Sequence, residues 1–252
     1  MTTNGQGDRP LRLIHGWGLP RTVWAALDEP LSARCRWSTL DLPGYGGTPD
    51  DGQDFQRTAQ SLADSLPPGC VLGGWSLGAL LALQVALLAR ERLAGLILIA
   101  ATPCFMQRAD WPEAQPAALL EGFAERVRTD PAATLSRFIT LFNQGDLHAR
   151  TISRQLSGLI CPLPVQAALQ RGLQWLREVD LRQRLAAIDL PILLLHGARD
   201  PLNPLVAARY LTANLPQARL EVLAGAAHAP FCSQPELCSQ LIADFCDHSV
   251  QH

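Results

Sequence analysis

Lysine is absent from this chain of 252 residues, and all 21 basic side chains are arginines. Because 23 acidic residues oppose them, the formal net charge at pH 7 is only −2. A protein that binds nucleic acid or an acidic membrane through general charge attraction carries a basic excess, which this chain does not have. We therefore expect neither kind of partner.

Paired cysteines and long apolar runs are also missing. The seven cysteines are odd in number and include no Cys-x-x-Cys pair, which argues against a zinc site and a disulfide framework. We expect most of them to be small buried hydrophobic residues in a reducing compartment. Residues 1–8 lack the apolar core of a signal peptide, and the longest apolar run, Ala79–Ala89, is too short to span a bilayer. These absences predict a soluble, cytoplasmic protein.

The chain does contain a regular succession of strand and helix patterns. Strands are predicted at Leu11–Ile14, Trp37–Leu40, from Val71 into the turn at Ser76, Leu96–Ile99, Pro191–His196 and Leu220–Leu223. Helices are predicted at Asp54–Leu66, Leu77–Ala89 and Pro235–Phe245. From Phe105 to Asp180 we find no good strand, only helices broken near prolines. This order predicts an α/β fold whose mostly parallel central sheet is flanked by helices, with a core at 1–104 and 183–252 and an inserted helical cap at 105–182.

One turn in this pattern is typical of a catalytic nucleophile. Gly74-Trp75-Ser76-Leu77-Gly78 matches Gly-x-Ser-x-Gly and lies between a predicted strand and an apolar helix. So tight a turn strains the serine backbone, and the two glycines leave room for the strand and helix to approach each other. The pattern predicts an exposed hydroxyl on Ser76.

A serine hydroxyl needs a base to take its proton, and the chain has six histidines. In the order serine, acid, histidine, the base follows the last strand, which leaves His228, His248 and His252. The last two lie in a polar tail expected to fray, whereas His228 lies in a small-residue loop directly after the final strand. We therefore predict His228 as the base.

The acid that orients this base should follow the preceding strand. Asp200 lies in the loop after Ile192–His196, at the strand end where ligand-facing residues of open α/β sheets gather. Asp189 precedes the same strand and would lie at the opposite edge of the sheet. Asp180, near the end of the cap, is a lesser rival, so Asp200 is the predicted acid.

The remaining part of such a site is a pair of backbone donors for the oxyanion. One is the N–H of Leu77, directly after the serine, and the other is expected in the loop after an early strand, at Trp17 of His15-Gly16-Trp17-Gly18. We expect His15 to shape that loop and His196 to be structural. This chemistry requires neither a metal nor an organic cofactor.

Five motifs together make the chain similar to the α/β-hydrolase superfamily. They are His15-Gly16-Trp17-Gly18, Asp41-Leu42-Pro43-Gly44-Tyr45-Gly46, Gly74-Trp75-Ser76-Leu77-Gly78, Gly197-Ala198-Arg199-Asp200 and Ala226-Ala227-His228-Ala229-Pro230. Within it, the loop tryptophan, the elbow, Trp175–Arg182 and Ala226–Phe231 resemble the pimeloyl-[acyl-carrier protein] methyl ester esterases of biotin synthesis. The resemblance covers almost the whole chain and implies the α/β-hydrolase fold.

The resemblance implies a serine carboxylesterase that removes the methyl ester from pimeloyl groups on acyl-carrier protein and releases methanol. Its substrate-binding residues carry over to Trp17, Ser76, Leu77, Phe138, Ile139, Thr140, Leu141 and Phe142. Cap arginines that meet the acidic carrier protein in that family resemble Arg137, Arg150 and Arg154. Arginine forks suit carboxylate and phosphate partners. We expect a monomer.

Two other functions fit the same residues. A general short-chain carboxylesterase would use the same catalytic set and an apolar cap pocket, and the Phe138–Phe142 segment would then be ordinary cap core. A non-catalytic binding module of the same fold is disfavoured by the intact set of Ser76, Asp200 and His228. A dehalogenase or an epoxide hydrolase of this fold would need an aspartate nucleophile in place of Ser76.

Overall fold

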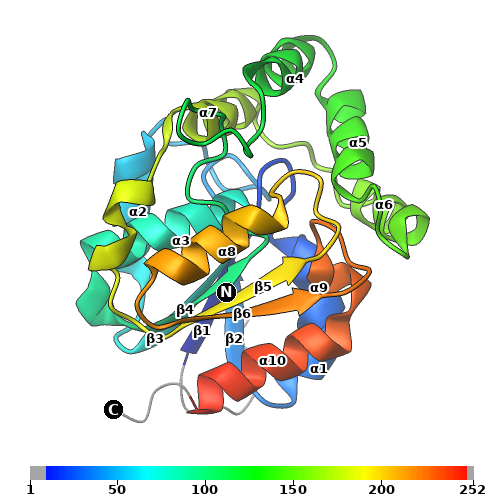
Figure 1. Cartoon of the computed structure of the whole chain (residues 1–252). Coiled ribbons are helices and arrows are strands. Elements are labelled where there is room, and N and C mark those ends of the chain that lie inside the picture. Colours follow the sequence, from blue (N-terminus) through cyan, green and yellow to red (C-terminus); the bar gives the residue numbers. More distant parts are fainter. Residues whose placement is uncertain (1–9, 249–252) are drawn as a thin grey trace.

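The computed structural model describes residues 10–248, and the side chain of His248 is not described. The polar stretch at 1–8 and the rival His252 lie outside this range. Six strands form one sheet in which all pairs are parallel, in the order β2-β1-β3-β4-β5-β6 (Figure 1). They are β1 (Pro10–Ile14), β2 (Arg36–Leu40), β3 (Cys70–Trp75), β4 (Leu93–Ile99), β5 (Ile192–Gly197) and β6 (Ala218–Leu223).

The six predicted strands are confirmed, with ends that differ by a few residues. The central strands β3 and β5 are buried along their whole length, which explains their continuous apolar sequences. Strand β6 lies at the edge of the sheet and is mostly half-exposed, so it carries Arg219 and Glu221 among its apolar residues.

Helices cover both faces of this sheet. In Figure 1, α2, α3 and α8 lie on one face, and α1, α9 and α10 lie on the other. The α-helices of the core are α1 (Asp28–Ser32), α2 (Phe55–Ser65), α3 (Leu77–Leu88), α8 (Leu205–Asn214), α9 (Pro230–Ser233) and α10 (Pro235–His248). The 3₁₀ turns are η1 (Arg21–Leu27), η2 (Arg90–Arg92) and η3 (Arg182–Ala187). Sequence patterns did not indicate α8, which buries small residues such as Ala207 and Ala208 rather than a clear apolar stripe.

Four further helices lie together between β4 and β5 in the chain, at the top of the molecule in Figure 1. They are α4 (Ala117–Thr129), α5 (Pro131–Phe142), α6 (Ala149–Ser157) and α7 (Gln166–Glu178). Prolines mark the beginnings of two of them, because Pro116 precedes α4 and Pro131 is the first residue of α5. Among the described residues, this segment contributes isolated bridges but no strand, as the sequence predicts.

Residues 10–248 include all seven cysteines. All seven are free, and five of them are buried. No helix within this range has both the length and the apolar character that crossing a membrane requires.

Candidate active site

The nucleophile elbow has the backbone that its sequence predicts. Ser76 joins β3 to α3 with φ 56° and ψ −115°, a left-handed conformation that non-glycine residues rarely adopt. The flanking glycines allow the close approach: a Cβ on Gly74 would overlap the backbone of Gly78, and one on Gly78 would overlap the carbonyl of Ile14. The elbow therefore stores strain in order to present the hydroxyl of Ser76.

The predicted base and acid lie together. Nδ1 of His228 is 2.8 Å from Oδ2 of Asp200, and both side chains are almost fully buried. The other carboxylate oxygen of Asp200 accepts hydrogen bonds from the backbone N–H groups of Leu202 and Asn203, both at 2.9 Å. Since the carboxylate can only accept, Nδ1 of His228 carries the proton. The acid is thus fixed by its own loop and holds the imidazole in one tautomer.

That tautomer leaves Nε2 of His228 as a free acceptor. This nitrogen is buried and has no hydrogen-bond partner within residues 10–248. An unpaired buried acceptor is costly, and this nitrogen can accept a proton without giving up a hydrogen bond. Nε2 of His228 therefore has the free acceptor position that the predicted base requires.

Trp75 connects the elbow to the histidine loop, a role that the sequence analysis did not predict. Its indole Nε1 donates to the carbonyl oxygen of His228 at 2.7 Å, and its ring lies 5.5 Å from the imidazole. The sequence feature that marks Trp75 is its position directly before Ser76 in the elbow motif. One buried hydrogen bond therefore joins the residue before the nucleophile to the backbone of the base.

The predicted oxyanion loop lies directly against the nucleophile. A Cβ placed on Gly16 would be 3.3 Å from the Cβ of Ser76, so the loop backbone passes close to the reacting atom. Leu77 is the first residue of α3, where backbone N–H groups have no partner within the helix. Trp17 follows Gly16, so both predicted donors belong to segments adjoining Ser76.

His15 supports this loop from within. Its Nε2 accepts the N–H of Leu42 at 3.0 Å, so Nδ1 carries the proton and donates to the carbonyl of Gly16 at 2.8 Å. Burial lowers the pKa of His15, which keeps the imidazole neutral despite Asp41 3.7 Å away. These bonds agree with the predicted loop-shaping role.

The two rival acids pair with other residues, and His196 has a backbone partner. Asp180 pairs with Arg182 at 2.7 Å, and Asp189 accepts from Gln217 at 2.6 Å. His196 donates from Nε2 to the carbonyl of Asn203 at 2.7 Å, and burial lowers its pKa. Nε2 of His196 also lies 3.7 Å from Oδ2 of Asp200, whereas the partners of Asp180 and Asp189 are other residues.

An aromatic cluster from the cap closes over the site. Phe138 packs edge-on against Trp17 with ring centroids 4.9 Å apart, and Phe142 lies 5.5 Å from the ring of His228. Phe123 of α4, which the sequence analysis did not single out, contacts both Trp17 and Phe138. The sequence feature that marks Phe123 is the helical spacing of apolar residues in α4, where Leu120, Phe123 and Val127 are buried.

The remaining residues of the predicted cap segment point in different directions. Ile139 is buried and Leu141 packs against the core, but Thr140 is exposed and donates its hydroxyl to the carbonyl of Ser136 at 3.0 Å. Residues two apart on a helix face nearly opposite sides, so Thr140 cannot share the site-facing side of Phe138 and Phe142. The structure therefore brings the two phenylalanines to the site and leaves Thr140 on the outer face.

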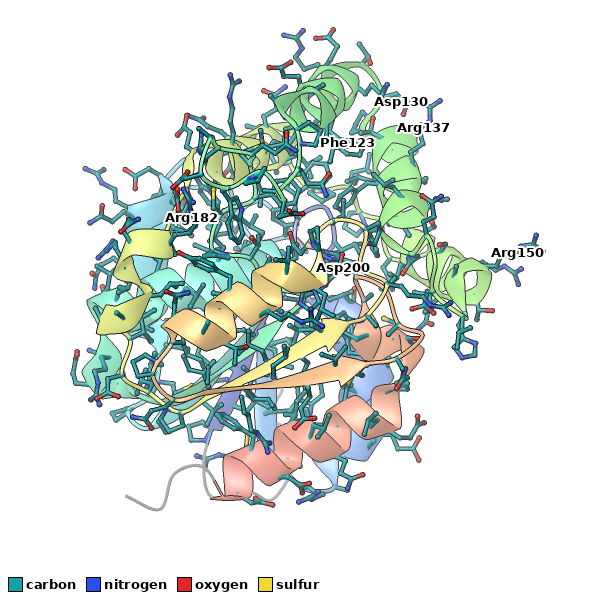
Figure 2. All side chains as sticks on the ribbon, viewed as in Figure 1. Phe123, Asp130, Arg137, Arg150, Arg182 and Asp200 are labelled. Carbon is teal, nitrogen blue, oxygen red and sulfur yellow. The ribbon has the colours of Figure 1, made fainter. Side chains whose placement is uncertain are left out.

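The three predicted carrier-contact arginines are exposed on the cap. In Figure 2, Arg137 of α5 and Arg150 of α6 project away from the core. None of Arg137, Arg150 and Arg154 forms an ion pair with another described residue. Arg150 and Arg154 share one face of α6, as their spacing predicts.

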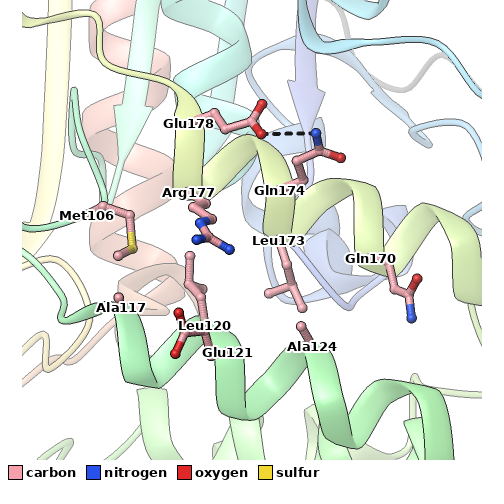
Figure 3. A pocket seen from close by; sticks show the side chains of 10 residues that line it. All are labelled: Met106, Ala117, Leu120, Glu121, Ala124, Gln170, Leu173, Gln174, Arg177 and Glu178. Carbon is pink, nitrogen blue, oxygen red and sulfur yellow. Dashed lines mark hydrogen bonds between the residues drawn. The ribbon is translucent and has the colours of Figure 1, made fainter.

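A cavity of about 340 Å³ opens between α4 and α7 (Figure 3). Leu120, Ala124 and Leu173 line it together with polar side chains such as Gln174, which donates to Glu178 at 3.0 Å. No catalytic candidate is among its lining residues. Ser76, Asp200 and His228 therefore do not line this cavity.

Two sequence comparisons bear on this geometry. A model of the alpha/beta hydrolase family matches residues 13–241. The chain is 43% identical over 245 residues to a pimeloyl-[acyl-carrier protein] methyl ester esterase of Aromatoleum aromaticum, covering 94% of this chain and 98% of the relative. It is 41% identical over 246 residues to the protein of the same name from Aeromonas hydrophila, covering 96% of each.

The solved structures agree on the fold. An esterase from Exiguobacterium antarcticum superposes with a TM-score of 0.89 at 22% sequence identity, covering 98% of this chain and 94% of that one. At this identity the likeness concerns the fold alone, and it confirms the predicted arrangement of a parallel sheet flanked by helices.

Proposed function

The chain belongs to the alpha/beta hydrolase family, and on that premise we propose that it is a serine esterase that hydrolyses the methyl ester of pimeloyl-[acyl-carrier protein] to the free acid and methanol. The names of full-length relatives at 38–43% identity support this substrate. The observation that carries the chemistry is the buried Asp200–His228 pair with its unpaired Nε2, which Trp75 joins by a hydrogen bond to the elbow whose serine has φ 56°.

The proposed reaction is acyl transfer in two steps. Nε2 of His228 takes the proton of Ser76 as its oxygen attacks the ester carbonyl, and Asp200 stabilises the resulting imidazolium. The N–H groups of Trp17 and Leu77 receive the negative charge of the tetrahedral intermediate. His228 then protonates the departing methoxide, and in the second step it activates the water that releases the acid. Every proton passes through one imidazole, so no further acid or base is required.

The cap supplies the proposed substrate contacts. We assign residues 105–182 to it and the remainder to the core. Trp17, Phe138 and Phe142 form an apolar wall suited to the methylene chain of a pimeloyl group, with Ser76 and Leu77 at its reacting end. The unpaired, exposed Arg137, Arg150 and Arg154 offer positive charge to an acidic carrier protein.

The setting of the reaction is part of the same proposal. We place the protein in the cytoplasm as a monomer that meets the carrier protein in solution. Seven free thiols are consistent with a reducing compartment.

A comparison of two substrates tests this function. The purified protein should turn over methyl-pimeloyl carrier protein with a higher kcat/KM than a free short-chain ester such as p-nitrophenyl butyrate. Equal or lower kcat/KM for the carrier-bound ester would support the general carboxylesterase instead.

Two controls separate chemistry from binding. A fluorophosphonate should label the wild type and fail to label Ser76→Ala. In cells that require biotin because they lack their own esterase, the wild type should restore growth and Ser76→Ala should not. Full rescue by Ser76→Ala would refute the mechanism, and an unlabelled wild type would favour a binding module.

A further inference from the structure

Asp146 is a buried carboxylate that the proposed mechanism does not use. It lies in the loop between α5 and α6 and is only 7% exposed. No cation pairs with it within residues 10–248. Burying an unpaired charge is expensive unless hydrogen bonds satisfy its oxygens, so the position of this side chain calls for a reason.

The carboxylate of Asp146 is surrounded by donors from two parts of the chain. Its Oδ2 accepts the backbone N–H of Ala227 at 2.8 Å, across 81 residues of sequence. Its Oδ1 accepts the N–H of His148 at 2.7 Å and the hydroxyl of Ser233 at 3.0 Å. All three hydrogen bonds that its side chain makes within residues 10–248 come from donors, so a carboxylate satisfies them all, whereas an amide has only one accepting oxygen.

The bond to Ala227 is one of several between this loop and the loop that carries the base. The carbonyl of Phe142 accepts the N–H of His228 at 3.2 Å, and the N–H of Leu147 donates to the carbonyl of Gly225 at 3.0 Å. The residues from Gly225 to His228 are thus held from the cap at three points. Of these three hydrogen bonds, only the one from Ala227, the residue directly before His228, has a side chain as its acceptor, the carboxylate of Asp146.

We infer that Asp146 is a positioning residue that fixes the backbone of His228 from the cap, and so keeps the imidazole aligned with both Asp200 and Ser76. This inference rests on the catalytic role proposed for His228. A displacement of about 1 Å at a reacting group can cost about 100-fold in rate. Removing the carboxylate frees the Ala227 N–H, so the loss falls on the chemical step rather than on substrate binding.

The test uses the full chain in three variants. Asp146→Ala removes every acceptor, Asp146→Asn keeps one, and Ser233→Ala removes a donor to the same carboxylate while leaving the Ala227 bond. We expect Asp146→Ala to lower kcat about 100-fold with KM unchanged, for p-nitrophenyl butyrate and for methyl-pimeloyl carrier protein alike. Asp146→Asn should fall between Asp146→Ala and the wild type, and Ser233→Ala should keep the wild-type kcat.

A spectroscopic readout separates positioning from general stability. The proton between Nδ1 of His228 and Asp200 should give a sharp downfield NMR resonance in the wild type and in Ser233→Ala, and a broadened or lost one in Asp146→Ala. If Asp146→Ala does not fold, the same comparison is made with Asp146→Asn, for which partial loss is expected.

Three outcomes would overturn the inference. The first is a wild-type kcat and an unchanged resonance in the folded Asp146 variants. The second is a loss of kcat in Ser233→Ala equal to that in Asp146→Ala, and the third is a loss of kcat confined to the carrier-bound substrate. The last would assign Asp146 to carrier docking. Failure of the proposed function is distinguishable, because it would appear in the wild type as poor turnover of the carrier-bound ester, while p-nitrophenyl butyrate would still report on Asp146.

Discussion

Gly78 offers the sharpest test of how the elbow and the oxyanion loop depend on each other. A Cβ added there would overlap the carbonyl of Ile14 and lie 2.5 Å from that of His15, whereas real Cβ atoms stay beyond about 3.0 Å. Both partners are backbone atoms, so no side chain can rotate away. Gly78→Ala must therefore push the beginning of α3 and the loop after β1 apart by about 0.5 Å or more.

This displacement acts on the two proposed oxyanion donors. Leu77 lies directly before Gly78, and Trp17 follows the loop residues that would be displaced. Since an oxyanion donor acts only at hydrogen-bond distance, we expect a loss comparable to removal of one donor, about 10²–10³ in kcat. Overpacking should also lower the free energy of unfolding by about 1–3 kcal/mol.

Gly122→Ala is the matched control for Gly78→Ala. Gly122 lies within α4, and the nearest atom to a Cβ there is 3.5 Å away, at the flexible end of Arg126. The control should keep the wild-type kcat and raise the free energy of unfolding by up to about 1 kcal/mol, because alanine favours the helix. The measurements are steady-state kinetics with p-nitrophenyl butyrate and urea melts. A folded Gly78→Ala protein with wild-type kcat would refute the reasoning.

Three further predictions follow from side-chain contacts. Asp200→Asn should lower kcat by about 10⁴ with the fold retained, because an amide permits the wrong tautomer of His228. Stopped-flow acylation measures the rate and circular dichroism measures the fold, and a loss of kcat below tenfold would contradict the prediction. Burial lowers the pKa of both His15 and His196, so the unfolded chain binds more protons below the ordinary value of about 6.5. The free energy of unfolding should therefore fall as pH drops below about 6.5, by up to about 1.4 kcal/mol per pH unit for each histidine. Urea melts at pH 7.5 and 5.5 test this, and an equal free energy of unfolding at the two pH values would contradict it. Arg150→Glu should raise KM for the carrier-bound ester about tenfold at low salt without changing KM for p-nitrophenyl butyrate, and a parallel rise for both esters would contradict docking at this residue.

The catalytic candidates were predictable because each is marked by local chemistry. The spacing of Gly74, Ser76 and Gly78 predicts a strained turn, and the structure contains one at Ser76. Asp200 and His228 follow the last two predicted strands, and parallel strands bring such loops to one edge of a sheet. Sequence order and strand patterns were therefore enough to predict that Asp200 and His228 lie together.

The cap was predicted less completely, because its side chains are placed by packing rather than by local rules. The Phe138–Phe142 segment was assigned as a block, yet the turn of α5 brings only some of its residues to the site and leaves Thr140 exposed. Phe123 comes from another helix, and the packing of α4 against α5 and α7 brings it to Trp17. Helix α8 lacked a clear stripe because it buries small residues.

By itself, the sequence determined the order of strands and helices, the strained serine, and the choice of His228 and Asp200, since turn geometry and strand periodicity are encoded within a few neighbouring residues. Only the tertiary structure decided that Trp75 donates to the carbonyl of His228 and that Asp146 reaches the N–H of Ala227. These pairs are 153 and 81 residues apart, and no local pattern specifies a contact over such distances. The assembly of the sheet brings Trp75 to the His228 loop, and the packing of the cap on the core brings Asp146 to Ala227.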